Sequence, residues 1–247
     1  MADGPLTGRI AVVTGASRGI GRAAALALAA AGAHIVALAR TQGALEELDD
    51  AIVAAGSTAT LVPVDLKDHD ALDRLGAGIH ERWRRLDILI ANAGLLGGLA
   101  PLAHQDPKTW ADVMAVNVTA NWRLIRSLDP LLRASDAGRV IFVTSGASWK
   151  RRAYWGLYSA SKAALDALAC TYAAETVTTP VRVMLVEPGP LRTKMRAAAM
   201  PGEDPETLRT PEDLAPHLVR LAAADWTETG KLYHFPSDRV LEFRHPA

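Results

Sequence analysis

Short runs of β-branched and other apolar residues alternate with alanine- and leucine-rich segments along nearly the whole chain. The runs are almost continuously apolar, which is typical of strands buried on both faces of a parallel sheet. Strands that alternate with helical segments indicate right-handed crossovers. The pattern predicts an α/β fold with a doubly wound parallel sheet of about seven strands, at residues 9–14, 34–39, 59–64, 87–91, 139–144, 181–187 and 232–235.

The segments between these runs are expected to be helices, at residues 19–31, 42–55, 69–83, 107–132, 158–176 and 211–224. Thr210 is the expected N-cap of the last one, because proline suits the first helical position that follows. No repeat or change of composition marks a boundary, so we expect a single domain over residues 1–247. The longest irregular stretch, around 189–210, includes a short alanine run that can form a short helix.

The charge balance argues against several kinds of partner. Lysine and arginine together number 27, as do aspartate and glutamate, so the formal net charge is zero. A neutral chain lacks the broad positive field of a nucleic-acid-binding protein. The most apolar stretch, 23–39, is interrupted by Gly32 and His34, so no membrane span is expected. The first residues show no basic segment followed by an apolar one, so no secretory signal is expected.

Cysteine and histidine usage restricts the chemistry further. Cys170 is the only cysteine, which excludes an intrachain disulfide framework and a cysteine-rich zinc site. A single cysteine suits a reducing compartment, so a cytoplasmic location is expected. The seven histidines show no metal-ligand spacing, and no metal site is expected.

A glycine-rich turn, TGASRGIG, joins the first predicted strand to the first predicted helix at residues 14–21. Gly15 lets the chain turn sharply, Gly19 lets the backbone approach a bound group, and Gly21 allows close helix–strand contact. A helix that begins here presents free N–H groups to a pyrophosphate, although a purely structural turn is the alternative reading. The predicted contacts come from Gly15, Ser17, Arg18, Gly19, Ile20 and Gly21.

The end of the second strand predicts which dinucleotide is bound. An Asp or Glu there would hold a ribose 2′-hydroxyl, but residues 38–41 read Leu-Ala-Arg-Thr. Arg40 and Arg18 can instead bind a 2′-phosphate, which favours NADP, with NAD possible if the arginines are merely solvated. Asp65 and Leu66 follow the third strand and are expected at the adenine edge, although Asp65 can equally cap a loop.

Tyr158 and Lys162 lie four residues apart at the start of a predicted helix, which places them on one face. A nearby ammonium lowers the pKa of a phenol and burial raises it. A tyrosine tuned in this way can exchange a proton with a carbonyl or an alcohol. Ser145 ends the fifth strand and can hydrogen-bond the same substrate oxygen. A tyrosine–lysine pair on the surface is the alternative.

These motifs resemble the short-chain dehydrogenase/reductase family, in its single-domain type, over residues 6–235. The glycine-rich turn resembles the family's TGxxxGxG loop, and Ser145, Tyr158 and Lys162 match its catalytic residues in order and spacing. Asn117 resembles the asparagine that completes the tetrad and helps to hold a water in the proton path. Within the family, the chain looks most like a poorly characterised bacterial branch.

Two further segments carry the resemblance. Asn92, Ala93 and Gly94 resemble the NAG segment that supports the sheet and the adenine side, although Ala91 stands where a second asparagine is common. Pro188 and Gly189, followed by Thr193, resemble the PGxxxT segment that meets the nicotinamide. The resemblance implies a Rossmann-like fold, with Lys162 also binding the nicotinamide ribose.

The implied activity is NADP-dependent hydride transfer to or from a small-molecule carbonyl or secondary alcohol. A cofactor-using epimerase or dehydratase and a non-catalytic NADP-binding regulator are the alternatives. The tetrad argues against a regulator. The chain length leaves little room for the separate substrate region of an epimerase or dehydratase. The resemblance also implies a homodimer or homotetramer, paired through the helices that contain Asn117 and Tyr158.

The segment between Ser145 and Tyr158 is expected to border the substrate. It contains three consecutive cations, Lys150, Arg151 and Arg152, flanked by aromatic residues. These cations can bind an anionic substrate group, or they can form a solvated basic loop. The stretch around 189–210, with Met195, is expected to form an apolar lid over the substrate, with simple surface packing as the alternative.

Overall fold

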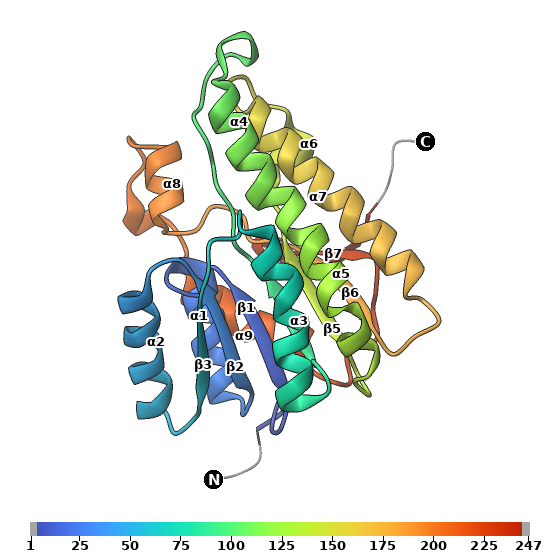
Figure 1. Cartoon of the computed structure of the whole chain (residues 1–247). Helices are drawn as coiled ribbons and strands as arrows, with labels where there is room; N and C mark the ends of the chain where they lie inside the picture. Colours follow the sequence, from blue (N-terminus) through green and yellow to red (C-terminus); the bar gives the residue numbers. More distant parts are fainter. Residues whose placement is uncertain (1–3, 244–247) are drawn as a thin grey trace.

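The computed structural model describes residues 4–243. It contains one eight-stranded sheet in the order β3-β2-β1-β4-β5-β6-β7-β8, flanked by helices on both faces (Figure 1). All neighbouring pairs are parallel except β7 and β8. The strands are β1 (Ile10–Thr14), β2 (His34–Ala39), β3 (Ala59–Pro63), β4 (Ile88–Ala91), β5 (Arg139–Val143), β6 (Arg182–Glu187), β7 (Lys231–His234) and β8 (Arg239–Glu242).

The doubly wound parallel sheet is therefore confirmed, with one strand more than predicted. The first three residues, on which the expectation of no secretory signal partly rests, lie outside the described range. β8 runs antiparallel at the edge of the sheet, and only Val240 and Leu241 in it are apolar. An edge strand with so short an apolar run carries little hydrophobic signal.

Two layers of helices cover the sheet, each over its own apolar cluster. Helices α1, α2 and α9 pack on one face, and α3, α5 and α7 pack on the other. The helices are α1 (Gly19–Ala30), α2 (Gln42–Ala54), α3 (His69–Trp83), α4 (Pro107–Met114), α5 (Ala120–Arg133), α6 (Ala147–Lys150), α7 (Gly156–Glu175), α8 (Lys194–Ala199) and α9 (Pro211–Ala222).

The central strands are buried along their whole length. Every residue of β1 and β5 is buried, which matches their almost continuously apolar sequences. The strand order reverses between β1 and β4, so the loops that follow these two strands diverge. In sheets of this kind a crevice forms at that switch point, outside the carboxyl ends of the strands.

The segment predicted as one helix over 107–132 is divided in the structure. A π-helical segment, Ala115–Thr119, separates α4 from α5 and contains Asn117. Apolar periodicity continues across such a bulge, so the sequence pattern does not reveal it, although π-bulges are frequent at functional sites. The predicted N-cap of α9 is confirmed, because Thr210 and Asp213 form a capping box.

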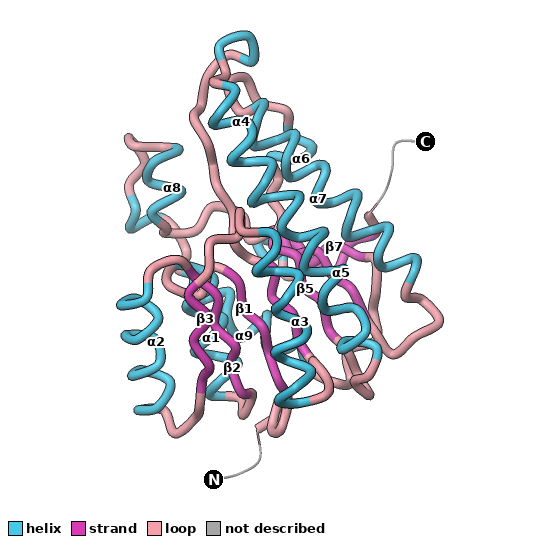
Figure 2. The backbone as a smooth tube through the Cα atoms, in the orientation of Figure 1, coloured by secondary structure: helices cyan, strands magenta, loops and turns pink. Residues whose placement is uncertain are grey.

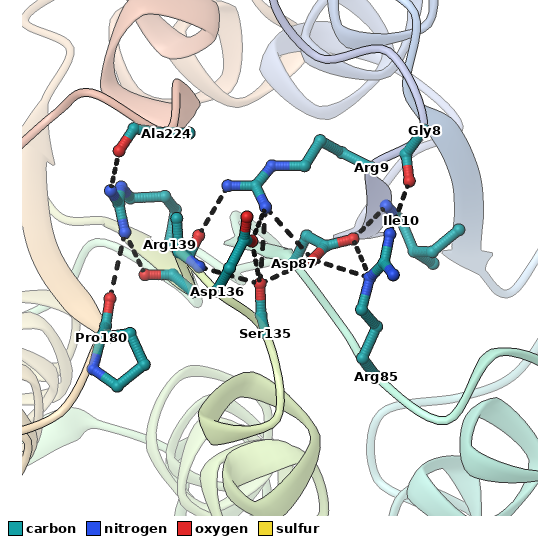
Figure 3. Close-up of polar contacts among 12 residues, drawn as sticks. Gly8, Arg9, Ile10, Arg85, Asp87, Ser135, Asp136, Arg139, Pro180 and Ala224 are labelled. Carbon is teal, nitrogen blue, oxygen red and sulfur yellow. Dashed lines mark hydrogen bonds and ion pairs between the residues drawn. The ribbon is translucent and has the colours of Figure 1, made fainter.

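A polar network occupies the opposite, amino-terminal edge of the sheet (Figure 3). Asp87 is fully buried and accepts hydrogen bonds from Arg9 at 3.3 Å, from Ser135 at 2.6 Å and from the backbone N–H of Ile10 at 2.9 Å. Arg139 donates to the carbonyl of Ala224 at 2.6 Å, just beyond α9. These contacts tie the starts of β1, β4 and β5 together and leave the carboxyl ends free for a site.

Candidate active site

A cavity of about 910 Å³ lies at the carboxyl ends of the parallel strands. Loops that follow each of the strands β1 to β6 line it, together with residues of α7 and α8. Figure 2 shows these loops leaving the sheet on the same side, below α4 and α8. The cavity is lined by all but two of the predicted site residues: Gly15, Ser17, Arg18, Gly19, Ile20, Arg40, Asp65, Leu66, Asn92, Ala93, Gly94, Ser145, Tyr158, Lys162, Pro188, Gly189 and Thr193.

The glycine-rich turn has the geometry that its sequence predicts. Gly15 and Gly19 adopt left-handed backbone angles, with φ of 66° and 54°. Gly21 lies behind the cavity lining, where a Cβ would come within 2.2 Å of the Gly15 carbonyl oxygen. Arg18 is the N-cap of α1 and its side chain makes no capping bond. The first N–H groups of α1 are therefore available to an anion.

Two arginines line the cavity near the ends of β1 and β2. Arg18 and Arg40 are both exposed, and among residues 4–243 no carboxylate pairs with either. Asp65 also lines the cavity, but it accepts a hydrogen bond from the backbone N–H of Lys67 at 3.0 Å. Asp65 therefore caps its loop, and its place in the cavity lining also allows it to contact a ligand.

The segment after β4 is tied to the end of β1. The Thr14 hydroxyl accepts hydrogen bonds from the backbone N–H groups of Asn92 and Ala93, both at 3.0 Å. The Asn92 side chain donates to the Thr14 carbonyl at 3.0 Å. These bonds hold the two loops on either side of the switch point in a fixed relation.

Tyr158 and Lys162 project from the first turns of α7 and are buried, with 8% and 3% of their surfaces exposed. The Lys162 Nζ donates to the Val143 carbonyl at 2.8 Å and lies 5.8 Å from the centre of the Tyr158 ring. Ser145 lies two residues after the end of β5 and lines the same cavity. The predicted tyrosine–lysine pair is therefore a buried pair and not a surface pair.

Burial dominates the acidity of both groups. It raises the pKa of Tyr158 to about 12, against a smaller lowering by the hydrogen bond with Ser145. Burial lowers the pKa of Lys162 to about 8, and the Asp166 carboxylate opposes this. At neutral pH the phenol thus keeps its proton and the amine remains charged. A protonated phenol that faces a cavity can act as a general acid toward a carbonyl oxygen.

Asn117 is fully buried and does not itself line the cavity. Its side chain donates to the Leu95 carbonyl and to the Ser161 hydroxyl, both at 2.9 Å, and accepts from the Leu95 N–H at 2.7 Å. A Cβ on Gly94 would lie 3.4 Å from the Asn117 Oδ1 and 3.6 Å from the Lys162 Nζ. Asn117 thus links the π-helical segment, the loop after β4 and the helix that carries Lys162.

Two buried carboxylates near the site were not predicted. Glu187 ends β6, lines the cavity and is only 2% exposed, with Lys150 Nζ at 3.7 Å and His234 Nε2 at 3.4 Å. Asp166 lies one helical turn after Lys162 and accepts a hydrogen bond from the Thr144 hydroxyl. The sequence contained a signal for each of them. Glu187 is a charged residue at the end of an apolar strand, and Asp166 is an acidic residue four positions after Lys162.

Together these features define a class of protein, an oxidoreductase that works with a nicotinamide dinucleotide. The turn can hold a pyrophosphate, and the buried phenol can exchange a proton while a hydride moves. Among residues 4–243, no cluster of His, Cys, Asp and Glu is suited to a metal ion, and no helix is long and apolar enough to cross a membrane.

Comparison with known proteins gives the family. Residues 9–204 match the short chain dehydrogenase family. The uncharacterised oxidoreductase YciK of Escherichia coli is 40% identical over 223 residues, which are 89% of this chain and 88% of that protein. The chain belongs to the short-chain dehydrogenase/reductase family, and its likeness to YciK bears out the resemblance to a poorly characterised bacterial branch.

Solved structures and other relatives add what those proteins bind. A short chain dehydrogenase from Shigella flexneri, solved with NADP, has a TM-score of 0.91 at 38% identity and covers 95% of this chain and 99% of its own. One from E. coli, solved with NADPH, has the same TM-score, identity and coverage. Two Mycobacterium tuberculosis proteins named NAD-dependent oxidoreductases are 38% identical over 206 residues, 78% of this chain and 74% of theirs.

Proposed function

We propose that this chain transfers hydride between C4 of the nicotinamide of NADP and a carbonyl or secondary alcohol. The observation that best supports this proposal is that Tyr158 and Lys162 are buried together beside Ser145. All three residues line the same cavity as the glycine-rich turn. When bound, NADP supplies or accepts the hydride. The phenol, the amine and the hydroxyl of this chain supply the proton and position the substrate.

The cavity fits a phosphorylated dinucleotide. Gly21 packs against Gly15 with no room for a Cβ, so the turn stays close to the free N–H groups of α1. Arg18 and Arg40 are the proposed partners of the 2′-phosphate, since each is free to make charge-assisted hydrogen bonds. The relatives solved with NADP and NADPH support this choice, and the relatives named NAD-dependent keep NAD as a second possibility.

The remaining cofactor contacts follow the cavity from end to end. Asp65 and Leu66 would meet the adenine, and the glycine-rich turn would meet the pyrophosphate. Lys162 would bind the nicotinamide ribose, as the family resemblance implies. The proposed contacts with the central part of the cofactor and with its nicotinamide end come from Asn92, Ala93, Gly94, Pro188, Gly189 and Thr193.

In the reducing direction, the Tyr158 hydroxyl donates its proton to the substrate oxygen as that oxygen gains negative charge. The Ser145 hydroxyl donates a hydrogen bond to the same oxygen. The charged Lys162 stabilises the phenolate that remains. Asn117 acts by positioning other groups. Its three hydrogen bonds link Leu95, in the loop after β4, to Ser161, which lies next to Lys162 on α7.

We also propose that the whole chain works as one domain, with residues 189–210 as its lid. This segment contains α8, and Met195 in it lines the cavity. Two ion pairs within the segment, Arg196 with Glu203 at 2.5 Å and Arg192 with Glu206 at 3.0 Å, would let it move as a unit. Protease nicking that NADP does not suppress would contradict a cofactor-ordered lid.

The proposal includes a cytoplasmic homodimer or homotetramer. A reducing compartment suits the single Cys170. The exposed Trp122 on α5 supports pairing through the helices that follow Asn117 and contain Tyr158, because large exposed apolar side chains favour interfaces. Light scattering that detects only a monomer would contradict the assembly.

The reaction is tested by NADPH consumption with a panel of ketones, aldehydes and 3-oxoacyl thioesters. We expect turnover with at least one carbonyl class, whereas a regulator would bind NADPH and turn nothing over. Arg40→Asp tests the cofactor choice in the same assay, since it removes one phosphate partner and adds a ribose acceptor. It should raise the KM for NADPH about tenfold or more and lower the KM for NADH. Unchanged Michaelis constants would contradict the assignment of Arg40.

A further inference from the structure

Positive charge in the cavity extends beyond the places proposed for the cofactor phosphates. The whole chain is formally neutral, so this charge is a local property. Arg18 and Arg40 lie beside the turn after β1 and the end of β2. Lys150 and Arg152 line the cavity from the segment between β5 and α7, which also bears Ser145. A concentration of one sign of charge in a cleft attracts ligands of the opposite sign.

The structure separates the three consecutive cations of this segment. Lys150 is paired with the buried Glu187, so its charge is largely balanced. Arg151 follows the last residue of α6, has a left-handed backbone, is exposed and lies outside the cavity lining. Arg152 lines the cavity, and no carboxylate among residues 4–243 lies within ion-pair distance of it. Of the three cations, Arg152 alone offers an unbalanced charge to a ligand in the cavity.

The backbone around Arg152 is held in an unusual conformation. Arg151 and Tyr154 have φ of 45° and 71°, a region that side-chain-bearing residues rarely adopt. The Arg152 carbonyl accepts from the Trp155 N–H at 3.2 Å, and the Tyr154 carbonyl accepts from the Ala100 N–H at 3.1 Å. Strained residues persist only where the surrounding structure enforces them, and they cluster at ligand sites. The loop is thus fixed with Arg152 at the cavity and Arg151 away from it.

We propose that the substrate carries an anionic group, a carboxylate or a phosphate ester, which Arg152 binds through its guanidinium. Both groups present paired oxygens that can accept two parallel hydrogen bonds from a planar guanidinium. Trp155, Leu96 and Met195 line the same cavity and can contact an apolar part of the substrate between this group and the reacting carbonyl. The inference rests on the proposed carbonyl chemistry at Tyr158 and adds the substrate class to it.

Three ketones with a common skeleton test the inference: 6-oxoheptanoate, its methyl ester and 6-oxoheptyl phosphate. For the wild type we expect kcat/KM at least about tenfold higher for one or both anions than for the ester, which corresponds to about 1.4 kcal/mol. Arg152→Ala should remove this preference while the KM for NADPH stays unchanged. Arg151→Ala is the matched control and should keep it. The better of the two anions identifies the group as a carboxylate or a phosphate.

Calorimetric binding of the same three compounds to the protein–NADP complex separates this inference from the proposed function. Anion binding that depends on Arg152 without any turnover would refute the reaction and support the anion site. Turnover of the ester with no preference for either anion would refute the anion site and support the reaction. Equal loss in the Arg151 and Arg152 variants, or no tighter binding of the anions than of the ester, also overturns the inference.

Discussion

The buried Lys162 should reduce the stability of this protein in a way that depends on pH. Lys162 is 3% exposed, and burial lowers its pKa from 10.5 to about 8. In the unfolded chain the amine recovers its ordinary pKa. A difference of this size corresponds to about 3 kcal/mol of free energy of unfolding, at 1.36 kcal/mol for each pKa unit. Because the side chain is fully enclosed, solvent screening reduces this figure little.

The direction follows from which state holds the proton. Below pH 8 the amine is charged in both states, and its burial destabilises the folded one. Between pH 8 and 10.5 the folded chain has released the proton and the unfolded chain still holds it, so stability rises with pH. Relative to Lys162→Met, the wild type should therefore gain about 3 kcal/mol across this window. Below pH 8 the difference should be constant.

Urea unfolding of both proteins without cofactor, from pH 7 to 11, measures this gain. Groups that titrate in both proteins cancel in the difference, and the loss of the Lys162 hydrogen bond to Val143 adds a constant offset. Lys108→Met is a matched control on α4, where the lysine side chain is 84% exposed, and should change stability by less than about 0.5 kcal/mol. Parallel curves for the wild type and Lys162→Met would refute the reasoning.

Three further substitutions test separate parts of the account. Gly21→Ala would place a Cβ 2.2 Å from the Gly15 carbonyl, so the Kd for NADPH by fluorescence titration should rise about tenfold or more, and an unchanged Kd would contradict the role of the turn. Asp87→Ala leaves the buried Ile10 N–H without its acceptor and Arg9 with only the exposed Asp136 as a charged partner, so urea unfolding should show a loss of about 2–4 kcal/mol, whereas a loss below about 1 kcal/mol would show that the network is dispensable. Ser145→Ala should lower kcat about 100-fold without changing the Kd for NADPH, and an unaltered kcat would remove Ser145 from the reaction.

Sequence patterns predicted most of the fold because the central strands are buried on both faces. β1 and β5 are almost continuously apolar and fully buried, so their hydrophobicity identified them. β8 was missed because it is a short antiparallel strand at the edge of the sheet. The division between α4 and α5 was missed because one extra residue per turn in the π-helical segment changes hydrogen bonds and leaves the apolar pattern intact.

The candidate site was predictable where chemistry depends on local spacing. Tyr158 and Lys162 share a helix face, and Gly15, Gly19 and Gly21 share one turn, so each set was visible in the sequence. The buried Glu187 was not, because its burial depends on packing of β6 against neighbouring elements. The different positions of Arg151 and Arg152 depend on backbone angles that residue type does not predict.

The central claim is that the Tyr158 hydroxyl protonates the substrate oxygen during hydride transfer. A single turnover of bound NADPH, followed by stopped-flow fluorescence in the wild type and in Tyr158→Phe, tests it most directly. The account predicts a Kd for NADPH within about threefold of the wild type and an oxidation rate lower by about 100-fold to 10,000-fold. Oxidation of NADPH by Tyr158→Phe at the wild-type rate would contradict it.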